Sequence, residues 1–287
     1  MSTHVDLYDN AYARAQHDLY RQVRTETYGH DLGQTSWVTA AESARIPELL
    51  NLTADSAVVE IGCGSGLYAL DLVSRLGCRI VGLDLNLHGI ATATQLAQAA
   101  GLDALARFEQ CDASQPLAFS DGSPDASPDG SPDASPDASP DAGFDAAFSN
   151  DALCHIPGRS GLLHELYRVL RPGGRLLFSD ALIIGGLIGA EELATRASIG
   201  PYFFSPPGEN ERLLSAAGFT ILSVTDTSDE AAGIALRWHE ARLRRREALT
   251  ALEGSERFEG LQRFLACVHT LTSERRLLRH LYLVEKP

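Results

Sequence analysis

Short apolar runs and longer segments of helical periodicity alternate along the chain, and this alternation is typical of an α/β fold. Runs that end at turn residues predict buried strands, whereas the segments between them predict amphipathic helices. Strands are expected at residues 58–61, 79–83, 107–111, 144–149, 175–182, 219–225 and 280–284. Helices are expected between them at residues 67–75, 87–100, 160–170 and 209–217. The pattern therefore predicts a seven-stranded sheet with helices on both faces.

Two further helical regions accompany this sheet. Residues 1–50 predict an N-terminal helical arm, which a loop at about residues 28–37 interrupts. Residues 229–273 predict a helical substrate cap between the last two strands. Residues 51–228 and 274–287 are then expected to form one ligand-binding domain around the sheet.

Two segments near the predicted ligand-binding edge have less regular patterns. Residues 185–207 are expected to be irregular, and they leave the carboxyl end of a strand, where they can form a roof over a bound ligand. In the first cap helix, Arg242 and its neighbours Arg244, Arg245 and Arg246 are interpreted as a solvated face rather than an anion site.

A tandem repeat interrupts the domain before the fourth strand. The tetrapeptide Asp-(Gly/Ala)-Ser-Pro occurs five times between Asp121 and Pro140. Proline at every fourth position blocks a helix, and nothing in the repeat supplies a core, so residues 121–143 are expected to form a disordered loop. A loop that leads into a parallel strand lies opposite the ligand-binding edge. The repeat is therefore interpreted as a tolerated expansion outside the site.

A glycine-rich turn follows the first strand, from Glu60 to Gly66, and Asp84 ends the second strand. Glycine allows positive φ and close approach of a ligand. A carboxylate at the end of the second strand can accept hydrogen bonds from both hydroxyls of a ribose. The glycines fall as G-x-G-x-G, and Leu67 stands where a dinucleotide-binding turn has its third glycine. The turn therefore favours a nucleoside ligand without a pyrophosphate, with a purely structural turn as the alternative.

Composition narrows the classes of partner. The 287 residues carry a formal net charge of -14, which disfavours nucleic acid and anionic membranes. The five cysteines form no C-x-x-C pair and the nine histidines form no ligand-spaced cluster, so neither a disulfide framework nor a metal site is expected. No apolar run approaches the ~18 residues of a membrane helix. A cytoplasmic location is expected, and the oligomeric state stays open, with a homodimer as one option.

Five segments occur in order between residues 45 and 225, and together they carry a family resemblance. They are Glu60–Gly66, Asp84, Asp112, Ser149–Pro157 and Leu166–Gly174. In this combination the chain resembles the class I S-adenosylmethionine-dependent methyltransferases, and it is similar to their small-molecule group of sarcosine/dimethylglycine, coclaurine and tocopherol methyltransferases. The resemblance implies a mostly parallel, Rossmann-like sheet with an antiparallel last strand. It also implies S-adenosylmethionine as cofactor and S-adenosylhomocysteine as product.

The resemblance assigns individual residues to the cofactor. It places Gly62, Gly64 and Gly66 against the methionine portion and Asp84 at the ribose. The other cofactor contacts that it implies are Glu60 and Cys63 in the glycine turn, Leu85 beside the adenine, Asp112 and Ala113 at the adenine amino edge, Asn150 at the methionine amino group, and Gln34 in the arm loop. The arm loop departs from the aromatic-Gly-x-x-x-x-x-Gly segment of the family, which puts a glycine-betaine-type acceptor in doubt.

Methyl transfer is an in-line displacement from a sulfonium, so alignment and desolvation can supply most of the acceleration. A base helps only an acceptor that must lose a proton. His155 is the candidate base because imidazole titrates near neutrality, and a histidine bonded to backbone beneath the cofactor is the alternative. Asp151 is the second candidate catalytic residue. Contacts to a small organic acceptor are expected from Tyr20, Trp37, Tyr202, Phe203, Trp238 and His239.

The sequence thus predicts methyl transfer to a nitrogen or oxygen atom of a small molecule. A carbon atom of a prenyl or aromatic compound is the alternative acceptor. Two other classes remain as rivals. A nicotinamide-dependent oxidoreductase is disfavoured by Leu67, and a non-catalytic cofactor-binding scaffold is disfavoured by the intact loops.

Overall fold

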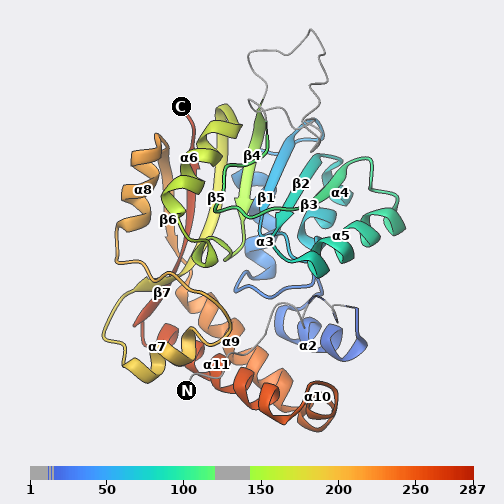
Figure 1. The fold of residues 1–287 in the computed structure, drawn as a ribbon, viewed down its shortest axis with the longest axis vertical. Helices are drawn as coiled ribbons and strands as arrows, with labels where there is room; N and C mark the ends of the chain where they lie inside the picture. The colour runs from blue at the N-terminus through green and yellow to red at the C-terminus, as the bar shows by residue number, and fades with distance from the viewer. Residues whose placement is uncertain (1–11, 13, 15, 120–142) are drawn as a thin grey trace.

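The computed structural model describes residues 12, 14, 16–119 and 143–287. These residues form a seven-stranded sheet in the order β3-β2-β1-β4-β5-β7-β6 (Figure 1). The strand β7 runs antiparallel to both of its neighbours, and the pairings from β3 to β5 are parallel. The predicted α/β fold with a mostly parallel, Rossmann-like sheet is therefore confirmed.

The elements fall into three groups by position. The strands are β1 (Ala57–Ile61), β2 (Arg79–Asp84), β3 (Ala106–Gln110), β4 (Phe144–Ser149), β5 (Leu170–Ile184), β6 (Thr220–Asp226) and β7 (Leu277–Glu285). The helices against the sheet are α3 (Ala40–Leu49), α4 (Leu67–Leu76), α5 (Leu87–Ala100), α6 (Arg159–Val169) and α8 (Glu209–Ala217). The helices grouped beyond the carboxyl ends of the parallel strands are α2 (Asp18–Tyr28), α7 (Ala190–Arg196), α9 (Ser228–Leu243), α10 (Arg246–Glu253) and α11 (Ser255–Ser273).

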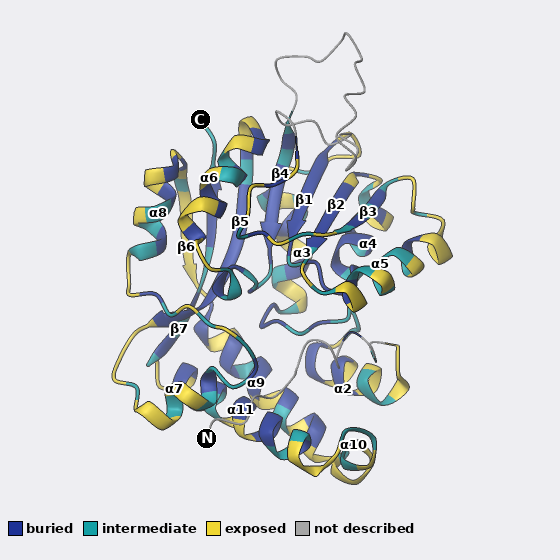
Figure 2. Cartoon of the chain, viewed as in Figure 1, coloured by how far each residue is buried: buried dark blue, intermediate teal, exposed yellow. Residues whose placement is uncertain are grey.

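Different helices bury the two faces of the sheet. Val58 of β1 lies in a cluster with α3, α4 and α5, whereas its neighbours Ala57 and Val59 lie in a cluster with α6 and α8. Successive strand residues point to opposite faces, and every residue of β1 is buried. Figure 2 shows the central strands buried between helices whose outer faces are exposed. The continuous apolar runs of the sequence therefore mark strands that are covered on both sides.

A third core joins the arm to the cap. Val23 of α2, Trp238 of α9 and Phe264 of α11 belong to it. The ring of Trp37, from the loop between α2 and α3, lies 6.0 Å from that of Trp238 and 6.2 Å from that of Phe264. The arm loop is thus held by the cap, and any movement of one against the other must disturb these aromatic contacts.

The interpretation of the cap arginines as a solvated face is wrong for Arg242. Its side chain is 1% exposed and pairs with the fully buried carboxylate of Glu253. The predicted first cap helix breaks after Leu243 into α9 and α10, which brings these two groups together. The more exposed Arg244 pairs with Glu26 of α2. Periodicity along one helix could not reveal pairs whose carboxylates come from other helices.

The roof segment contains a helix that the sequence pattern missed. The helix α7 begins after Gly189, whose N–H donates to the Glu192 carboxylate at 2.8 Å. Acidic residues in its first turn suit the helix dipole, and its Ala, Glu and Leu residues favour the helical state. The segment still leaves the carboxyl end of β5, as predicted.

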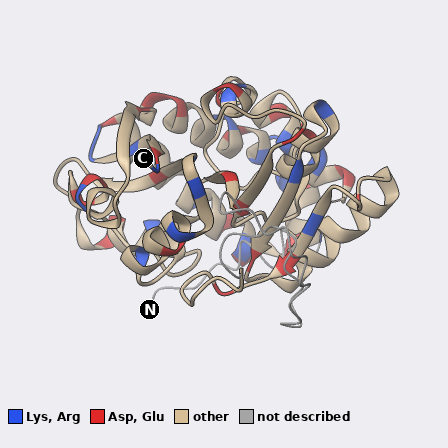
Figure 3. Ribbon diagram, turned by 90° about the horizontal axis from the view of Figure 1, so that it is seen from above, with Lys and Arg blue, Asp and Glu red and all other residues tan. Residues whose placement is uncertain are grey.

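Charged residues of both signs are interspersed along the described ribbon (Figure 3). Among the described helices, none combines the length and apolarity that crossing a bilayer requires. Two sequence predictions lie outside the described residues: the first eleven residues of the helical arm and the repeat at residues 121–140.

Candidate active site

A cavity of about 560 Å³ lies at the carboxyl ends of β1, β2 and β4. Doubly wound sheets bind ligands at this edge, and the volume suits a small organic ligand. The turns after four strands, the arm and the roof all contribute to its wall. The lining includes Tyr12, Thr35, Ser36, Gly62, residues 84–88, 111–113, 150–152 and 155–157, and Pro201.

The glycine turn after β1 gives the cavity a wall made of backbone. Gly62 and Gly64 have φ of +76° and +53°, in the left-handed region that favours glycine. A Cβ on Gly62 would lie 2.3 Å from the Cβ of Ala152, and one on Gly64 would lie 2.8 Å from the hydroxyl oxygen of Tyr12. Both conformation and space therefore require glycine at these positions.

Asp84 at the end of β2 holds the glycine turn in place. Its Oδ2 accepts a hydrogen bond from the N–H of Gly64 at 2.8 Å, and its Oδ1 accepts one from the N–H of Asn86 at 2.8 Å. Burial raises the pKa of Asp84, and these backbone N–H groups oppose the rise. Each oxygen keeps a second lone pair, so the carboxylate can also accept from ligand hydroxyls. The adjacent Leu85 is 65% exposed at the rim of the cavity.

Asp112 and Ala113 line the same cavity after β3. Oδ1 of Asp112 accepts hydrogen bonds from the N–H and the hydroxyl of Ser114, at 3.0 and 2.6 Å. The bond from the Ser114 hydroxyl is the main reason that the pKa of Asp112 is lowered. Asp112 therefore shapes the turn after β3, and its remaining lone pairs are available at the adenine end that the sequence predicts.

Two shielded polar groups near the glycine turn have no hydrogen-bond partner among the residues that the structure describes. The Oε2 atom of Glu60 and the Nδ2 atom of Asn150 are both buried without a hydrogen bond. Burial, with a smaller contribution from Asp84, holds the pKa of Glu60 well above its usual range. A ligand that carries an ammonium and a carboxylate would give such groups partners, so they fit the methionine portion of S-adenosylmethionine. Cys63 is buried within the turn.

His155 stands in the cavity wall on the β4 side. Its ring lies 4.3 Å from that of Tyr202, and its Nδ1 lies 2.9 Å from the carbonyl oxygen of Pro201. A carbonyl only accepts, so Nδ1 carries the proton and Nε2 carries the lone pair. Burial lowers the pKa of His155 to about 4, which corrects the expectation that it titrates near neutrality. The imidazole is therefore uncharged at neutral pH.

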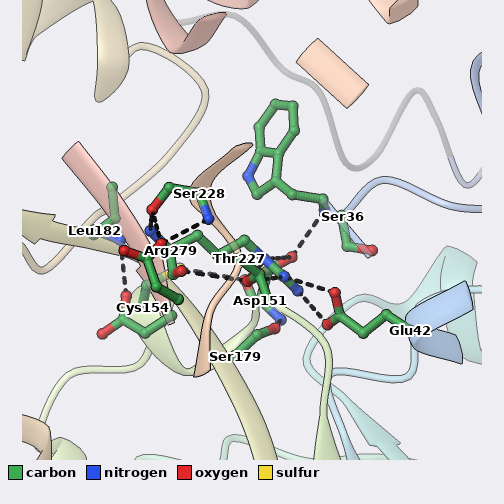
Figure 4. Close-up of polar contacts among 12 residues, drawn as sticks. Ser36, Glu42, Asp151, Cys154, Ser179, Leu182, Thr227, Ser228 and Arg279 are labelled. Atoms are coloured by element: carbon green, nitrogen blue, oxygen red, sulfur yellow. Dashed lines mark hydrogen bonds and ion pairs between the residues drawn. The ribbon is translucent and has the colours of Figure 1, made fainter. Parts of the chain in front are cut away.

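Asp151, the other predicted catalytic residue, is engaged by the protein. It is buried, has a left-handed φ of +57°, and lines the cavity. Its carboxylate accepts a hydrogen bond from Nε of Arg279 at 2.9 Å (Figure 4). It accepts another from the N–H of Trp37 at 2.8 Å. The carboxylate of Asp151 is thus engaged by β7 and by the arm loop.

Several residues that the sequence assigns to ligands lie away from the cavity lining. Trp37 and Trp238 pack in the cap core, and Tyr20 donates its hydroxyl proton to Glu253 at 2.7 Å. Gln34 is buried, and its Oε1 accepts a hydrogen bond from the N–H of Leu32 at 2.8 Å. Tyr202, Phe203 and His239 are likewise absent from the lining, although the ring of Tyr202 lies 4.3 Å from that of His155.

Sequence reasoning did not assign Tyr12, Thr35, Ser36, His88 or Pro201 to the site, although all five line the cavity. The hydroxyl oxygen of Tyr12 lies 3.5 Å from Oγ1 of Thr35. Burial raises the pKa of Tyr12, so its hydroxyl stays protonated at neutral pH. No local motif distinguishes a packed tyrosine from one that borders a ligand.

Comparisons with known proteins identify the family of this chain. Residues 36–224 match the family described as Methyltransferase domain. Methyltransferase GfsG of Streptomyces halstedii is 26% identical over 238 residues, which cover 78% of this chain and 75% of that protein. The 27-O-demethylrifamycin SV methyltransferase of Amycolatopsis mediterranei is 26% identical over 63% of this chain, and the chain spans 62% of its length, less than two thirds.

A solved structure of similar fold has a cofactor product bound. It is phosphoethanolamine N-methyltransferase 2 of Haemonchus contortus in complex with phosphomonomethylethanolamine and S-adenosylhomocysteine. The TM-score is 0.76 at 20% identity, and the match covers 99% of this chain and 61% of that one. At this identity the likeness concerns the fold.

Proposed function

The chain belongs to the Methyltransferase domain family, and from that premise we propose that it methylates a hydroxyl oxygen of a mid-sized, partly apolar organic molecule. It is an enzyme that uses S-adenosylmethionine and yields S-adenosylhomocysteine. Membership of this family decides against the nicotinamide-dependent oxidoreductase. The acceptor class and the roles of individual residues are the content of the proposal.

We assign the cofactor to the cavity at the ends of β1, β2 and β4. Asp84 would hold the ribose hydroxyls, the glycine turn and Asn150 would hold the methionine portion, and Asp112 with Ala113 would border the adenine. When bound, S-adenosylmethionine supplies an electrophilic methyl group on a sulfonium. The unpartnered Glu60 and Asn150 atoms and the glycine-built wall support this assignment.

The observation that carries the choice of acceptor is the orientation of His155. His155 lines the β4 side of the cavity, and its Nδ1 lies 2.9 Å from the Pro201 carbonyl oxygen, so the lone pair of the neutral ring is on Nε2. Asp84 stands on the β2 side, with β1 between the two. His155 would therefore meet the acceptor, and it would take up the hydroxyl proton as the oxygen attacks the methyl group. A neutral amine needs no such base.

The acceptor end of the cavity is largely apolar. Ile156, Pro157 and Pro201 line it. Such a surface favours a partly apolar molecule over a free amino acid. The relative from Amycolatopsis mediterranei, whose name states 27-O-demethylrifamycin SV as its substrate, supports an oxygen acceptor of this kind.

We also propose a cytoplasmic location and no nucleic-acid partner. The five cysteines are free thiols, which suits a reducing compartment, and the net charge of -14 repels polyanions. The cap at residues 229–273 would act on the acceptor indirectly, because its aromatic core holds the arm loop and the roof.

The function is tested by incubating the enzyme with isotope-labelled S-adenosylmethionine and matched acceptors that carry a hydroxyl or an amine. We expect label on the hydroxyl compounds together with release of S-adenosylhomocysteine. In the variant His155→Gln, kcat should fall about 100-fold or more through loss of the base, while cofactor affinity is retained. The wild-type kcat should be flat from about pH 6 to 9, because a base with a pKa of about 4 is already deprotonated there.

His164→Gln is the matched control for this test. His164 lies on the exposed side of α6, and its Nδ1 also lies within hydrogen-bond distance of a backbone carbonyl, that of Ser160 at 2.7 Å. Its turnover should equal that of the wild type. Transfer only to amines, or an undiminished kcat in His155→Gln, would contradict the proposed acceptor and base.

A further inference from the structure

Arg279 of β7 lies opposite an irregularity in β5. Asp180 pairs with His280 and Ile183 pairs with Leu278, so two residues of β5 face the single residue Arg279. Bulges of this kind re-aim side chains and are frequent beside active sites. Here the side chain of Arg279 is fully buried, at the level of the loop that follows β4.

The guanidinium of Arg279 joins three segments, of which the loop after β4 lines the cavity. Its Nε donates to Asp151 after β4 at 2.9 Å, and its Nη1 donates to the hydroxyl of Thr227, just before α9, at 2.7 Å. Its Nη1 and Nη2 donate to the two carboxylate oxygens of Glu42 on α3, at 2.9 and 2.8 Å. Figure 4 shows Arg279 between Asp151 and Glu42, with Thr227 beside them. We call these four residues the Arg279 cluster.

The Arg279 cluster reaches the cavity through the backbone of the arm loop. Asp151 accepts a hydrogen bond from the N–H of Trp37 at 2.8 Å, and the two residues before Trp37, Thr35 and Ser36, line the cavity. The N–H of Asp151 itself donates to Oγ of Ser179 at 3.0 Å, which fixes its left-handed backbone. The position of this wall is therefore set by contacts that start at β7.

The charges of the Arg279 cluster indicate that it fixes the relative position of two loops rather than adding to the stability of the fold. One guanidinium faces two carboxylates, Asp151 and Glu42, whose side chains are 5% and 9% exposed. Buried ion clusters add little net stability compared with apolar packing, and they are best accounted for where a fixed arrangement is needed. The arrangement fixed here is that of the arm loop against the loop after β4.

We propose that Arg279 is a positioning residue for methyl transfer: through Asp151 it holds residues 35–37 closed across the cofactor cavity. It touches neither the cofactor nor the acceptor, and it acts by keeping the wall in place. The proposal rests on the placement of the cofactor given above.

The test compares Arg279→Met with Arg242→Met. Both substitutions break a buried arginine–carboxylate contact, but the pair of Arg242 with Glu253 meets the arm through Tyr20 of α2 and not through residues 35–37. Affinity for S-adenosylhomocysteine is measured by calorimetry, and hydrogen exchange is followed in a peptide covering residues 32–39. We expect Arg279→Met to weaken binding about tenfold and to speed exchange in that peptide, while Arg242→Met lowers the melting temperature without either effect.

Asp151→Asn provides a milder second variant, because it keeps the shape and one acceptor for the Trp37 N–H but loses the charge pair. It should weaken binding in the same direction, and adding it to Arg279→Met should cause little further loss. Unchanged binding and exchange in a folded Arg279→Met or Asp151→Asn, or equal losses in Arg242→Met, would overturn the proposal. If the wild type itself bound no S-adenosylhomocysteine, the cofactor placement would fall and this inference with it.

Discussion

Gly64 shows how tightly a single residue can constrain the cavity. Its φ of +53° belongs to the left-handed region, its N–H donates to Asp84, and the Tyr12 side chain lies against its Cα. The left-handed φ constrains the backbone alone, whereas the contact with Tyr12 constrains the wall of the ligand-binding cavity. The two constraints can be separated by substitution, because Gly101 also has a left-handed φ of +66°, but no atom of the described residues would lie within 4 Å of a Cβ there.

We therefore predict different outcomes for Gly64→Ala and Gly101→Ala. Each should lose about 1–2 kcal/mol of unfolding free energy from left-handed strain. Only Gly64→Ala should also weaken S-adenosylhomocysteine binding, by about tenfold or more, because its methyl group displaces Tyr12 and the turn. Denaturant titration and calorimetry measure the two effects. Equal affinities in the two variants would contradict a role of this wall in binding.

His155 illustrates what a sequence reveals about a functional residue and what it omits. Its position just after β4 follows from the local pattern. Its tautomer and its lowered pKa do not, because they depend on Pro201 and Tyr202 in the roof. Trp238 shows the opposite case: an aromatic residue expected to meet the acceptor instead fills the cap core. Local patterns place a residue along an element, whereas its chemistry depends on distant neighbours.

At the scale of elements, local signals located most helices and strands. The strand β4 and the helix α8 have the predicted bounds, Phe144–Ser149 and Glu209–Ala217. The sequence did not show the break between α9 and α10, which carries neither proline nor glycine. Arg242 and Glu253 meet across it, so the break is stabilised by a tertiary ion pair rather than by a local signal.

The Arg242–Glu253 pair should therefore matter far more than its exposed neighbour. Arg242→Met leaves the buried Glu253 carboxylate without its main cation and should lower the unfolding free energy by about 3–5 kcal/mol. Arg246→Met, which removes a surface pair with Glu259, should cost less than about 1 kcal/mol. Urea denaturation of both variants gives the comparison. Similar losses would show that the cap does not depend on the buried pair.

At the scale of the whole molecule, the cavity collects residues from most of the chain. Its lining runs from Tyr12 to Pro201, and the cluster that braces it joins Arg279 to Glu42, 237 positions apart. The strand and turn pattern together with the family resemblance predicted that the glycine turn and Asp84 contribute to a ligand site. Contacts such as that between Arg279 and Asp151 could not be predicted, because periodicity and spacing carry no information on which buried side chains meet across so long a separation in the sequence.

The repeat is the one large segment that we expect the enzyme not to need. It precedes β4, whose amino end lies opposite the cavity. The described residues on its two sides stay together without it, since the rings of Phe119 and Phe144 lie 5.0 Å apart. Gly143 must be kept, because a Cβ there would lie 2.8 Å from the backbone nitrogen of Arg171. Removal of residues 124–142 should therefore rejoin the chain without strain.

Shortening this loop from about 24 to about 5 residues changes the closure entropy by only about 1.4 kcal/mol, in favour of the folded state. We expect the shortened enzyme to keep its cofactor affinity and kcat within about threefold of the wild-type values, which is a change of less than about 1 kcal/mol in the free energy of binding or activation. It should melt at the same temperature or slightly higher. Calorimetry, turnover assays and thermal unfolding, carried out on the wild-type and the shortened enzyme, test these three expectations. If the shortened chain folds with an unchanged melting temperature yet no longer binds S-adenosylhomocysteine, the repeat belongs to the catalytic unit and its placement at the opposite edge is refuted.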